Sequence, residues 1–327
     1  MFDYERVIAI LPERLGDSLF HTPSLRVIKT LRPQIKLDVI ALSPLCAEVL
    51  HNNPYVDAVH VLLNKTEIKR IAQQYEVTLM LHAHSIARQH AEWLALETIP
   101  MPSPASPRHW SQHSLEFTCS LLGADAREVD SRYDLFPAVS NVDKVNSLLE
   151  INGYHEGDIL IGCHIGCHSI AKRGLRFWRS LTHPKVWPFE NFVKLEAALR
   201  IIEPRIRFVL TGSQGEKSLG EKFMKQAPRS INLIDRTSVL DLAALMDRLT
   251  LFITPDTGVM HVACARKVGI VALFGPTDLQ VTGPHPRRNN HLVLQAMDLA
   301  DLSVADVIDS VTSHPDFIRT RTSLGVC

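Results

Sequence analysis

Residues Leu251 to Asp278, LFITPDTGVMHVACARKVGIVALFGPTD, show how this chain folds more directly than any other stretch. Leu251 to Thr254 is an apolar run of strand length, and a proline ends it. Asp256 stands where an N-cap belongs, ahead of a helix that we expect from about Thr257 to Lys267. Ile270 to Phe274 is then the next buried strand, closed by a Gly-Pro turn. This order predicts two parallel strands joined by a helix whose first N–H groups favour an anion.

The same alternation continues through both halves of the chain. Helix-like segments separate apolar runs of strand length, a pattern that predicts parallel strands covered by helices on both faces. The other expected strands are Arg6 to Leu11, Leu37 to Leu42, Ala58 to Leu63, Val77 to His82, Ile159 to His164, Arg207 to Thr211 and Ile231 to Leu233. We therefore predict an α/β fold with two Rossmann-like, doubly wound parallel sheets.

The length of 327 residues suits two domains better than one core. The pattern changes to a linker from Asp134 to Asn141, and a polar helix and a turn follow it. We place the domain boundary at that turn, which gives domains of residues 1–153 and 154–327. The amphipathic segment Val304 to Thr312 is expected to pack back across the boundary, and the tail from His314 is expected to be poorly anchored. The proline-rich residues 98–112 are expected to form a loop.

The composition excludes several classes of protein. The 35 basic and 35 acidic side chains give a formal net charge of zero, so no overall field attracts nucleic acid. No apolar run approaches the roughly 18 to 20 residues that span a bilayer, and the N-terminus lacks the apolar region of a cleavable signal. We expect a cytoplasmic protein without a transmembrane segment. The six cysteines lie mostly in apolar segments, which is typical of buried thiols rather than of disulfides.

Polar residues that follow strands are the candidates for chemistry, because ligands of doubly wound sheets bind at the carboxyl ends of the strands. In the first domain, Gly16 and Asp17 follow the first strand. The Asp17 carboxylate could act as general base for a hydroxyl, a role that contributes about 10²–10⁴-fold to the rate. The alternative is that Asp17 caps the next turn.

In the second domain, three loops follow strands: His164 to Cys167, Thr211 to Glu216 and Asp256 to Gly258. Glu216 could accept hydrogen bonds from ribose hydroxyls, or it could be a carboxylate at a helix N-terminus. Lys185, next to a Trp-Pro helix start, is the member of a basic run that we place on a diphosphate. The first loop lies in the sequence CHIGCH, for which a metal or haem site is the alternative to a simple loop at a strand end.

Three familiar motifs are missing from the sequence. No G-x-G occurs, so the dinucleotide fingerprint of dehydrogenases is missing, and Gly212 to Ser218 departs from a P-loop because Glu216 precedes its lysine. No D-x-D occurs to hold a divalent metal on a nucleotide diphosphate. A bound diphosphate must therefore be neutralised by Lys185, His261 and helix N-terminal amides.

A set of motifs in order along the chain resembles glycosyltransferase family nine, the heptosyltransferases of lipopolysaccharide core assembly. The most specific part is Asp256-Thr257-Gly258 followed by a Gly-Pro-Thr turn. The motifs are Gly16-Asp17 with Thr22 to Arg26, Lys185 to Pro188, Gly212 to Glu216, Asp256 to Gly258 with His261 to Ala263, and Phe274 to Thr277.

The resemblance implies a GT-B fold, in which an acceptor domain and a donor domain face one cleft. It also implies an inverting, metal-independent transfer that needs no cofactor, with ADP-heptose as donor. The catalytic aspartate of the family falls on Asp17, and the lysine that contacts the diphosphate falls on Lys185. The ribose-binding glutamate falls on Glu216.

Further donor-site residues follow from the same resemblance. The phosphate-binding residues fall on Asp256, Thr257, Gly258 and His261. Thr237 matches a position that lines the adenine pocket. Gly166 and Cys167 replace small hydroxyl residues of the family at the donor site, and the segment Ser169 to Pro184 is longer than usual.

The acceptor is implied to be a hydroxyl of the lipopolysaccharide core or of a related glycan or glycolipid. Arg14, His84, Arg88 and Arg108 are candidates for contact with a phosphorylated acceptor, with a solvated surface as the alternative. A peripheral contact with the cytoplasmic face of the inner membrane fits such an acceptor. Two other functions stay open: the same fold acting with another nucleotide sugar or a protein acceptor, and a non-catalytic nucleotide-binding protein.

Overall fold

A computed structural model of the chain describes residues 2–61, 63–82, 85–166 and 185–323. The chain divides into two compact units, Met1–Phe136 and Pro137–Cys327, and each is described by itself. None of the helices in the described parts of the chain has the length and apolar character needed to cross a membrane.

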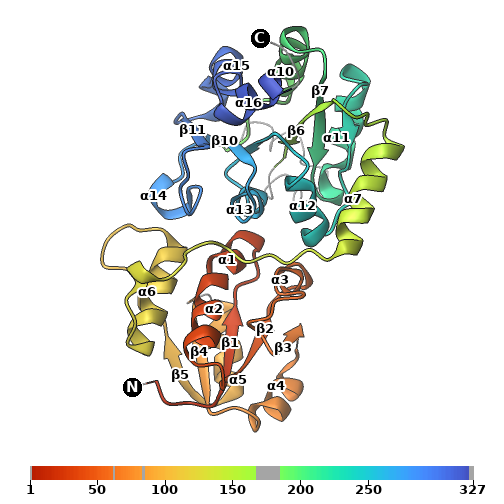
Figure 1. The fold of residues 1–327 in the computed structure, drawn as a ribbon. Helices are drawn as coiled ribbons and strands as arrows, with labels where there is room; N and C mark the ends of the chain where they lie inside the picture. Colours follow the sequence, from red (N-terminus) through yellow and green to blue (C-terminus); the bar gives the residue numbers. More distant parts are fainter. Residues whose placement is uncertain (1, 62, 83–84, 167–184, 324–327) are drawn as a thin grey trace. The chain divides into compact units, whose positions relative to one another are not determined.

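The first unit is built on a parallel five-stranded sheet of order β3-β2-β1-β4-β5 (Figure 1). Its strands are β1 (Arg6–Leu11), β2 (Lys36–Ala41), β3 (Ala58–Val61), β4 (Val77–Met80) and β5 (Glu97–Pro100). The central strand pairs with a neighbour on each side, and Val7 lies opposite both Leu37 and Val77. All of β1 beyond its first residue is buried, as expected for a parallel sheet covered on both faces.

The helices of the first unit alternate with these strands. They are α1 (Leu15–Phe20), α2 (Thr22–Leu31), α3 (Pro44–Val49), α4 (Lys65–Ala72), α5 (Ser85–Leu94) and α6 (Trp110–Leu122). Ile8 and Ile10 of β1 pack in one core cluster with Ile68 of α4 and Ala87 of α5. Because successive strand residues point to opposite faces, the intervening buried residues of β1 serve the other face, where α2 and α6 pack together.

The second unit repeats the plan with a parallel six-stranded sheet of order β11-β10-β9-β6-β7-β8. Its strands are β6 (Ile159–His164), β7 (Ile206–Thr211), β8 (Ile231–Asn232), β9 (Leu251–Pro255), β10 (Gly269–Phe274) and β11 (His291–Gln295). Its helices are α7 (Val139–Ile151), α10 (Phe189–Ile202), α11 (Lys217–Gln226), α12 (Val239–Met246), α13 (Gly258–Cys264), α14 (Leu279–Thr282), α15 (Val304–Thr312) and α16 (Pro315–Ser323). The prediction of two parallel α/β sheets is confirmed.

The division between the units falls at Phe136, before the boundary expected at residue 153. The reason is helix α7, which packs on α12 of the second unit. Asp241 of α12 is almost fully buried and accepts hydrogen bonds from Asn141 (2.8 Å) and Lys144 (2.5 Å) of α7. The polar helix after the linker therefore belongs to the second unit.

The C-terminal segment also differs from the expectation. The buried residues Val307 and Val311 of helix α15 lie in the core cluster of the second unit, and packing of this helix across the boundary stays a prediction. The tail is well anchored rather than loose. His314 and Phe317 are fully buried, and His314 Nε2 lies 3.2 Å from the backbone oxygen of Asn290.

Three local predictions were wrong in detail. The loop that was expected to carry Asp17 is helix α1, and part of the proline-rich loop is the edge strand β5. Strand β11 was not predicted. The N-cap of α13 is Thr257 rather than Asp256, because Thr257 is the last residue with an extended backbone (φ −141°, ψ 163°).

Candidate active site

The three loops singled out in the second unit leave neighbouring strands of the sheet. Strands β9, β6 and β7 are adjacent, so His164 to Gly166, Thr211 to Glu216 and Asp256 to Gly258 all follow strand ends at one edge. Carboxyl ends of adjacent parallel strands are where doubly wound folds bind their ligands. The structure thus brings most of the predicted donor residues to one place in this unit.

Lys185 and Asp256 form an ion pair at this edge. The Lys185 Nζ donates to Asp256 Oδ2 over 3.2 Å, although 71 positions separate the residues in the chain. The Asp256 side chain is 10% exposed and that of Lys185 is 34% exposed. The carboxylate therefore holds the ammonium group in place, and the Lys185 side chain keeps some exposure to solvent.

Helix α13 begins directly after this pair. Thr257 is its N-cap, and the Thr257 hydroxyl lies 3.3 Å from Thr254 Oγ1. Within the described residues, the Thr257 side chain caps no backbone N–H of the helix. Gly258 follows as the first helical residue, so the main chain next to Lys185 carries only small side chains.

His261, one turn into α13, is buried. Burial lowers the pKa of His261 to about 3, and the nearby His285 adds to this lowering. The imidazole is therefore neutral near pH 7. The sequence analysis counted His261 among the groups that neutralise a diphosphate; the structure leaves that charge to Lys185 and allows His261 only hydrogen bonding.

Glu216 closes a capping box at the start of the short helix before α11. Its Oε2 accepts from the Ser213 backbone N–H (2.7 Å) and hydroxyl (3.1 Å). Glu216 is thus a carboxylate at a helix N-terminus, the alternative considered from the sequence. A second role toward ribose stays a prediction. Gly166 packs directly on this carboxylate, since a Cβ there would lie 1.9 Å from Glu216 Oε1.

His164 is the functional candidate that the sequence analysis did not single out as such. It is buried, its Nδ1 lies 3.1 Å from the Thr211 carbonyl oxygen, and its Nε2 lies 3.7 Å from Glu216 Oε1. The signal was present in CHIGCH, but the segment was interpreted as a simple loop at a strand end, with a metal or haem site as the alternative. Cys163 is fully buried within β6, and burial raises the pKa of its thiol.

Several predicted residues lie outside these contacts. Thr237 is half-buried just before Ser238, the N-cap of α12, and its place at an adenine pocket stays a prediction. Cys167, His84 and the segment Ser169 to Pro184 lie outside the described residues.

In the first unit, Asp17 lies in the first turn of α1, next to the carboxyl end of β1. Two hydroxyl groups fix the preceding loop: Ser18 donates to the Pro12 carbonyl (2.9 Å) and Ser43 to the Glu13 carbonyl (3.0 Å). Burial raises the pKa of the Cys46 thiol, and the negative charge of Asp17 adds to that shift. The half-buried Asp17 is therefore held on a rigid turn at the ligand-binding edge of its sheet.

The acceptor candidates of the first unit are spread over several elements. Arg14 is the exposed N-cap of α1, and Arg88 is exposed on α5. Arg108 precedes α6 and forms an ion pair with Glu116 of that helix, which offsets its charge. The structure does not gather these three arginines into one cluster, so a phosphate contact by any of them stays a prediction.

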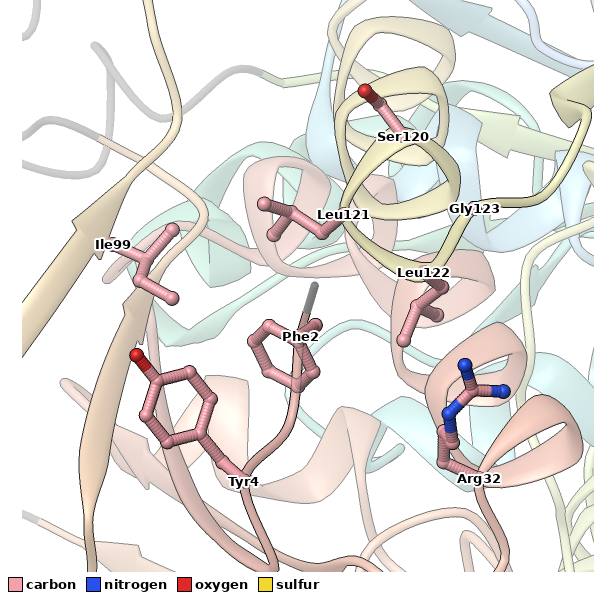
Figure 2. Close-up of a pocket in the computed structure, with 8 residues that line it drawn as sticks. All are labelled: Phe2, Tyr4, Arg32, Ile99, Ser120, Leu121, Leu122 and Gly123. Atoms are coloured by element: carbon pink, nitrogen blue, oxygen red, sulfur yellow. The ribbon is translucent and has the colours of Figure 1, made fainter.

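A hollow of about 530 Å³ lies in the first unit away from Asp17 (Figure 2). Phe2 and Tyr4, which precede β1, face Ile99 of β5 and the last turn of α6. The hollow thus begins at the amino end of β1, whereas Asp17 follows its carboxyl end. The described residues that line it include none of the candidates, and we assign it no part in the site.

The part of the chain that matches a known protein family lies within the second unit. Residues 179–311 match the model of glycosyltransferase family 9 (heptosyltransferase). A stretch of 105 residues is 31% identical to lipooligosaccharide heptosyltransferase 2 of Haemophilus influenzae. That stretch is 31% of this chain and 30% of the relative, so the sequence match spans less than a third of that protein.

Solved structures match over almost the whole chain. A glycosyl transferase family 9 protein from Veillonella parvula superposes with a TM-score of 0.78 at 20% identity, covering 99% of this chain and 97% of its own. The Escherichia coli ADP-heptose LPS heptosyltransferase II superposes with a TM-score of 0.74 at 16% identity, covering 96% and 99%. At such identities the likeness establishes the fold.

Two parallel-sheet units of this kind define the GT-B fold of glycosyltransferases. Over residues 179–311, the chain is similar to glycosyltransferase family 9 (heptosyltransferase).

Proposed function

We propose that this protein is an inverting, metal-independent glycosyltransferase that transfers heptose from ADP-heptose to a hydroxyl of a lipopolysaccharide core or a related glycan. The observation that carries the proposal is the Lys185–Asp256 pair at the start of α13. It lies within residues 179–311, the part of the chain that matches family 9. The Lys185 ammonium group, held by Asp256, is a fixed positive charge that supports the binding of a diphosphate at this edge.

On the donor side, Lys185 binds the diphosphate, and the first turn of α13 presents its backbone N–H groups beside it. His261 contributes a neutral polar contact, because its pKa is lowered to about 3. Glu216 accepts from the ribose hydroxyls, and Thr237 contacts the base. Gly166 and Cys167 are assigned to the donor site from their places in the sequence.

On the acceptor side, Asp17 takes the proton of the attacking hydroxyl. The acceptor oxygen forms a bond to the anomeric carbon from the face opposite the diphosphate, the bond to the diphosphate oxygen breaks, and the configuration inverts. ADP leaves with the new negative charge stabilised by Lys185. The proposal requires that Asp17 of the first unit and Lys185 of the second meet the same donor sugar.

The test combines nucleotide binding with a transfer assay. Calorimetry with ADP, UDP and GDP identifies the base, and turnover of ADP-heptose is then measured with core oligosaccharide acceptors. Asp17→Asn is expected to bind ADP like the wild type and to lose about 10²–10⁴-fold in turnover. Glu13→Gln, which changes a carboxylate of the same loop without a proposed role, is the matched control and keeps its turnover.

Three results would count against the proposal. Near-full turnover in Asp17→Asn removes the aspartate from its role. A preference for UDP or GDP replaces the donor with another nucleotide sugar. ADP binding without transfer to any acceptor favours a non-catalytic protein.

A further inference from the structure

His164 links two strands and a carboxylate at the donor edge of the second unit. It is the last residue of β6 and lies in register with Thr211, the last residue of β7. Its Nδ1 is 3.1 Å from the Thr211 carbonyl oxygen and 3.3 Å from Thr211 Oγ1. The Thr211 hydroxyl can donate to Nδ1, and the ring proton is then carried by Nε2. The other ring nitrogen, Nε2, is then turned to Glu216 Oε1 at 3.7 Å.

The Glu216 carboxylate has little freedom in this setting. Its Oε2 is taken by the Ser213 N–H and hydroxyl. Two glycines form the walls: a Cβ would lie 1.9 Å from Oε1 at Gly166, and 2.8 Å from Oε2 at Gly212. The side chains of His164 and Glu216 are only 6% and 4% exposed. The direction of Oε1 is therefore set by the His164 ring and the main chain of Gly166.

We propose that His164 is a positioning residue of the nucleotide site, whose Nε2 fixes the direction in which Glu216 Oε1 meets the ribose hydroxyls. The inference rests on the proposed function, because it takes Glu216 as the ribose acceptor. An ionised carboxylate has about four acceptor positions, and the two bonds from Ser213 leave room for a ligand hydroxyl. An acceptor that is already held in direction costs less entropy on binding than one that must be ordered.

Two substitutions separate the two ring nitrogens. The His164→Asn amide lies near the place of Nδ1, so it can keep the bond to Thr211 but loses the contact with Glu216. The longer His164→Gln amide lies near the place of Nε2 and keeps the contact with Glu216 instead. A purely structural histidine that joins β6 to β7 would be replaced better by Asn, whereas a positioning residue for Glu216 would be replaced better by Gln.

The assay is calorimetric binding of ADP, 2′-deoxy-ADP and 3′-deoxy-ADP to the full chain. We expect the wild type to bind ADP about tenfold more tightly than at least one deoxy analogue, since a hydrogen bond to a charged group is lost. His164→Asn should weaken the binding of ADP about tenfold and leave the affinity for that deoxy analogue unchanged. The preference for ADP over the analogue is then lost. His164→Gln should retain it. Thermal melting followed by circular dichroism checks that both variants are folded.

The outcomes separate this inference from the proposed function. If His164→Asn still prefers ADP to the deoxy analogue and His164→Gln does not, the inference about His164 is overturned and the proposed function is not affected. A wild type that binds ADP without preferring it to either analogue removes Glu216 from ribose binding, and the inference with it. A wild type that binds no ADP overturns the proposed donor itself.

A second variant keeps the inference testable if His164→Asn folds poorly. Glu216→Gln is expected to lose the discrimination on its own. Adding His164→Ala, which removes the ring, to Glu216→Gln should then weaken ADP binding no further than Glu216→Gln alone, because both residues act through one contact. Additive losses overturn the inference.

Discussion

Replacing Gly166 by Ala adds one methyl group against the Glu216 carboxylate. The new Cβ would lie 1.9 Å from Oε1 and 2.5 Å from Cδ, where ordinary contacts begin near 3.4 Å. The carboxylate must therefore move by about 1.5 Å, which breaks its bonds of 2.7 and 3.1 Å to Ser213. Overpacking of this kind costs about 1–3 kcal/mol, and we expect a loss of about 2 kcal/mol in the free energy of unfolding.

The assay is a double-mutant cycle with Glu216→Ala, followed by urea unfolding. In that background the clash is gone, and Gly166→Ala should be neutral or stabilise by about 0.5 kcal/mol, because Ala lowers the entropy of the unfolded chain. Gly166 has no positive φ that would strain an alanine. Equal losses from Gly166→Ala in both backgrounds would refute the packing of Gly166 on Glu216.

Three further predictions concern charge and pH. Lys185→Gln should weaken the binding of ADP at least tenfold in calorimetry, whereas Lys194→Gln on the exposed face of α10 should not change it. Equal effects of the two substitutions would contradict a diphosphate contact by Lys185. Burial lowers the pKa of His291 to about 3 from 6.5, so its contribution to stability is present above pH 6.5 and is lost as the pH falls toward 3. His291→Gln should therefore flatten the fall in the urea midpoint between pH 6.5 and 4, and an unchanged slope would contradict this. Asp241→Ala should lower the free energy of unfolding in urea by about 1–2 kcal/mol, because it removes a capping box and the bonds to α7. Asp247→Ala, at an exposed ion pair, should lower it by less than about 0.5 kcal/mol. Similar losses in the two variants would rule out a special role for the buried carboxylate.

The central strands could be predicted because strands that are buried on both faces consist almost entirely of apolar residues. Every residue of β6, β9 and β10 is buried, and each strand is almost wholly apolar. The edge strands carry no such pattern. Strand β5 is half-exposed and ends in a proline, and most of β11 is only partly buried, so both resemble loops in the sequence.

The ends of the second unit depend on contacts that no local pattern contains. Asp241 and the residues of α7 that bond to it are about a hundred positions apart, so the sequence analysis placed the polar helix in the first domain. The tail looked unanchored because only the fold shows that Phe317 enters the core.

The site was predicted unevenly. Lys185 and Asp256 were chosen from their positions at predicted helix starts, and the resemblance to a family agreed with both; the structure supplies the direct contact between them. The neutral state of His261 follows from burial, which a histidine in a short helix does not reveal in the sequence. His164 was passed over because its role depends on Thr211 and Glu216, which lie about fifty residues further along the chain.

The contact of α7 with Asp241 of α12 has a consequence for synthesis of the chain on the ribosome. Asn141 leaves the ribosome 100 residues before its partner Asp241, a delay of about 5–20 s at roughly 5–20 residues per second. During that interval the apolar positions Val145 and Leu149 of α7 have no partner helix to cover them. The helix that follows the first unit therefore waits for its partner during synthesis, and its apolar face is open to chaperones and to aggregation in that interval.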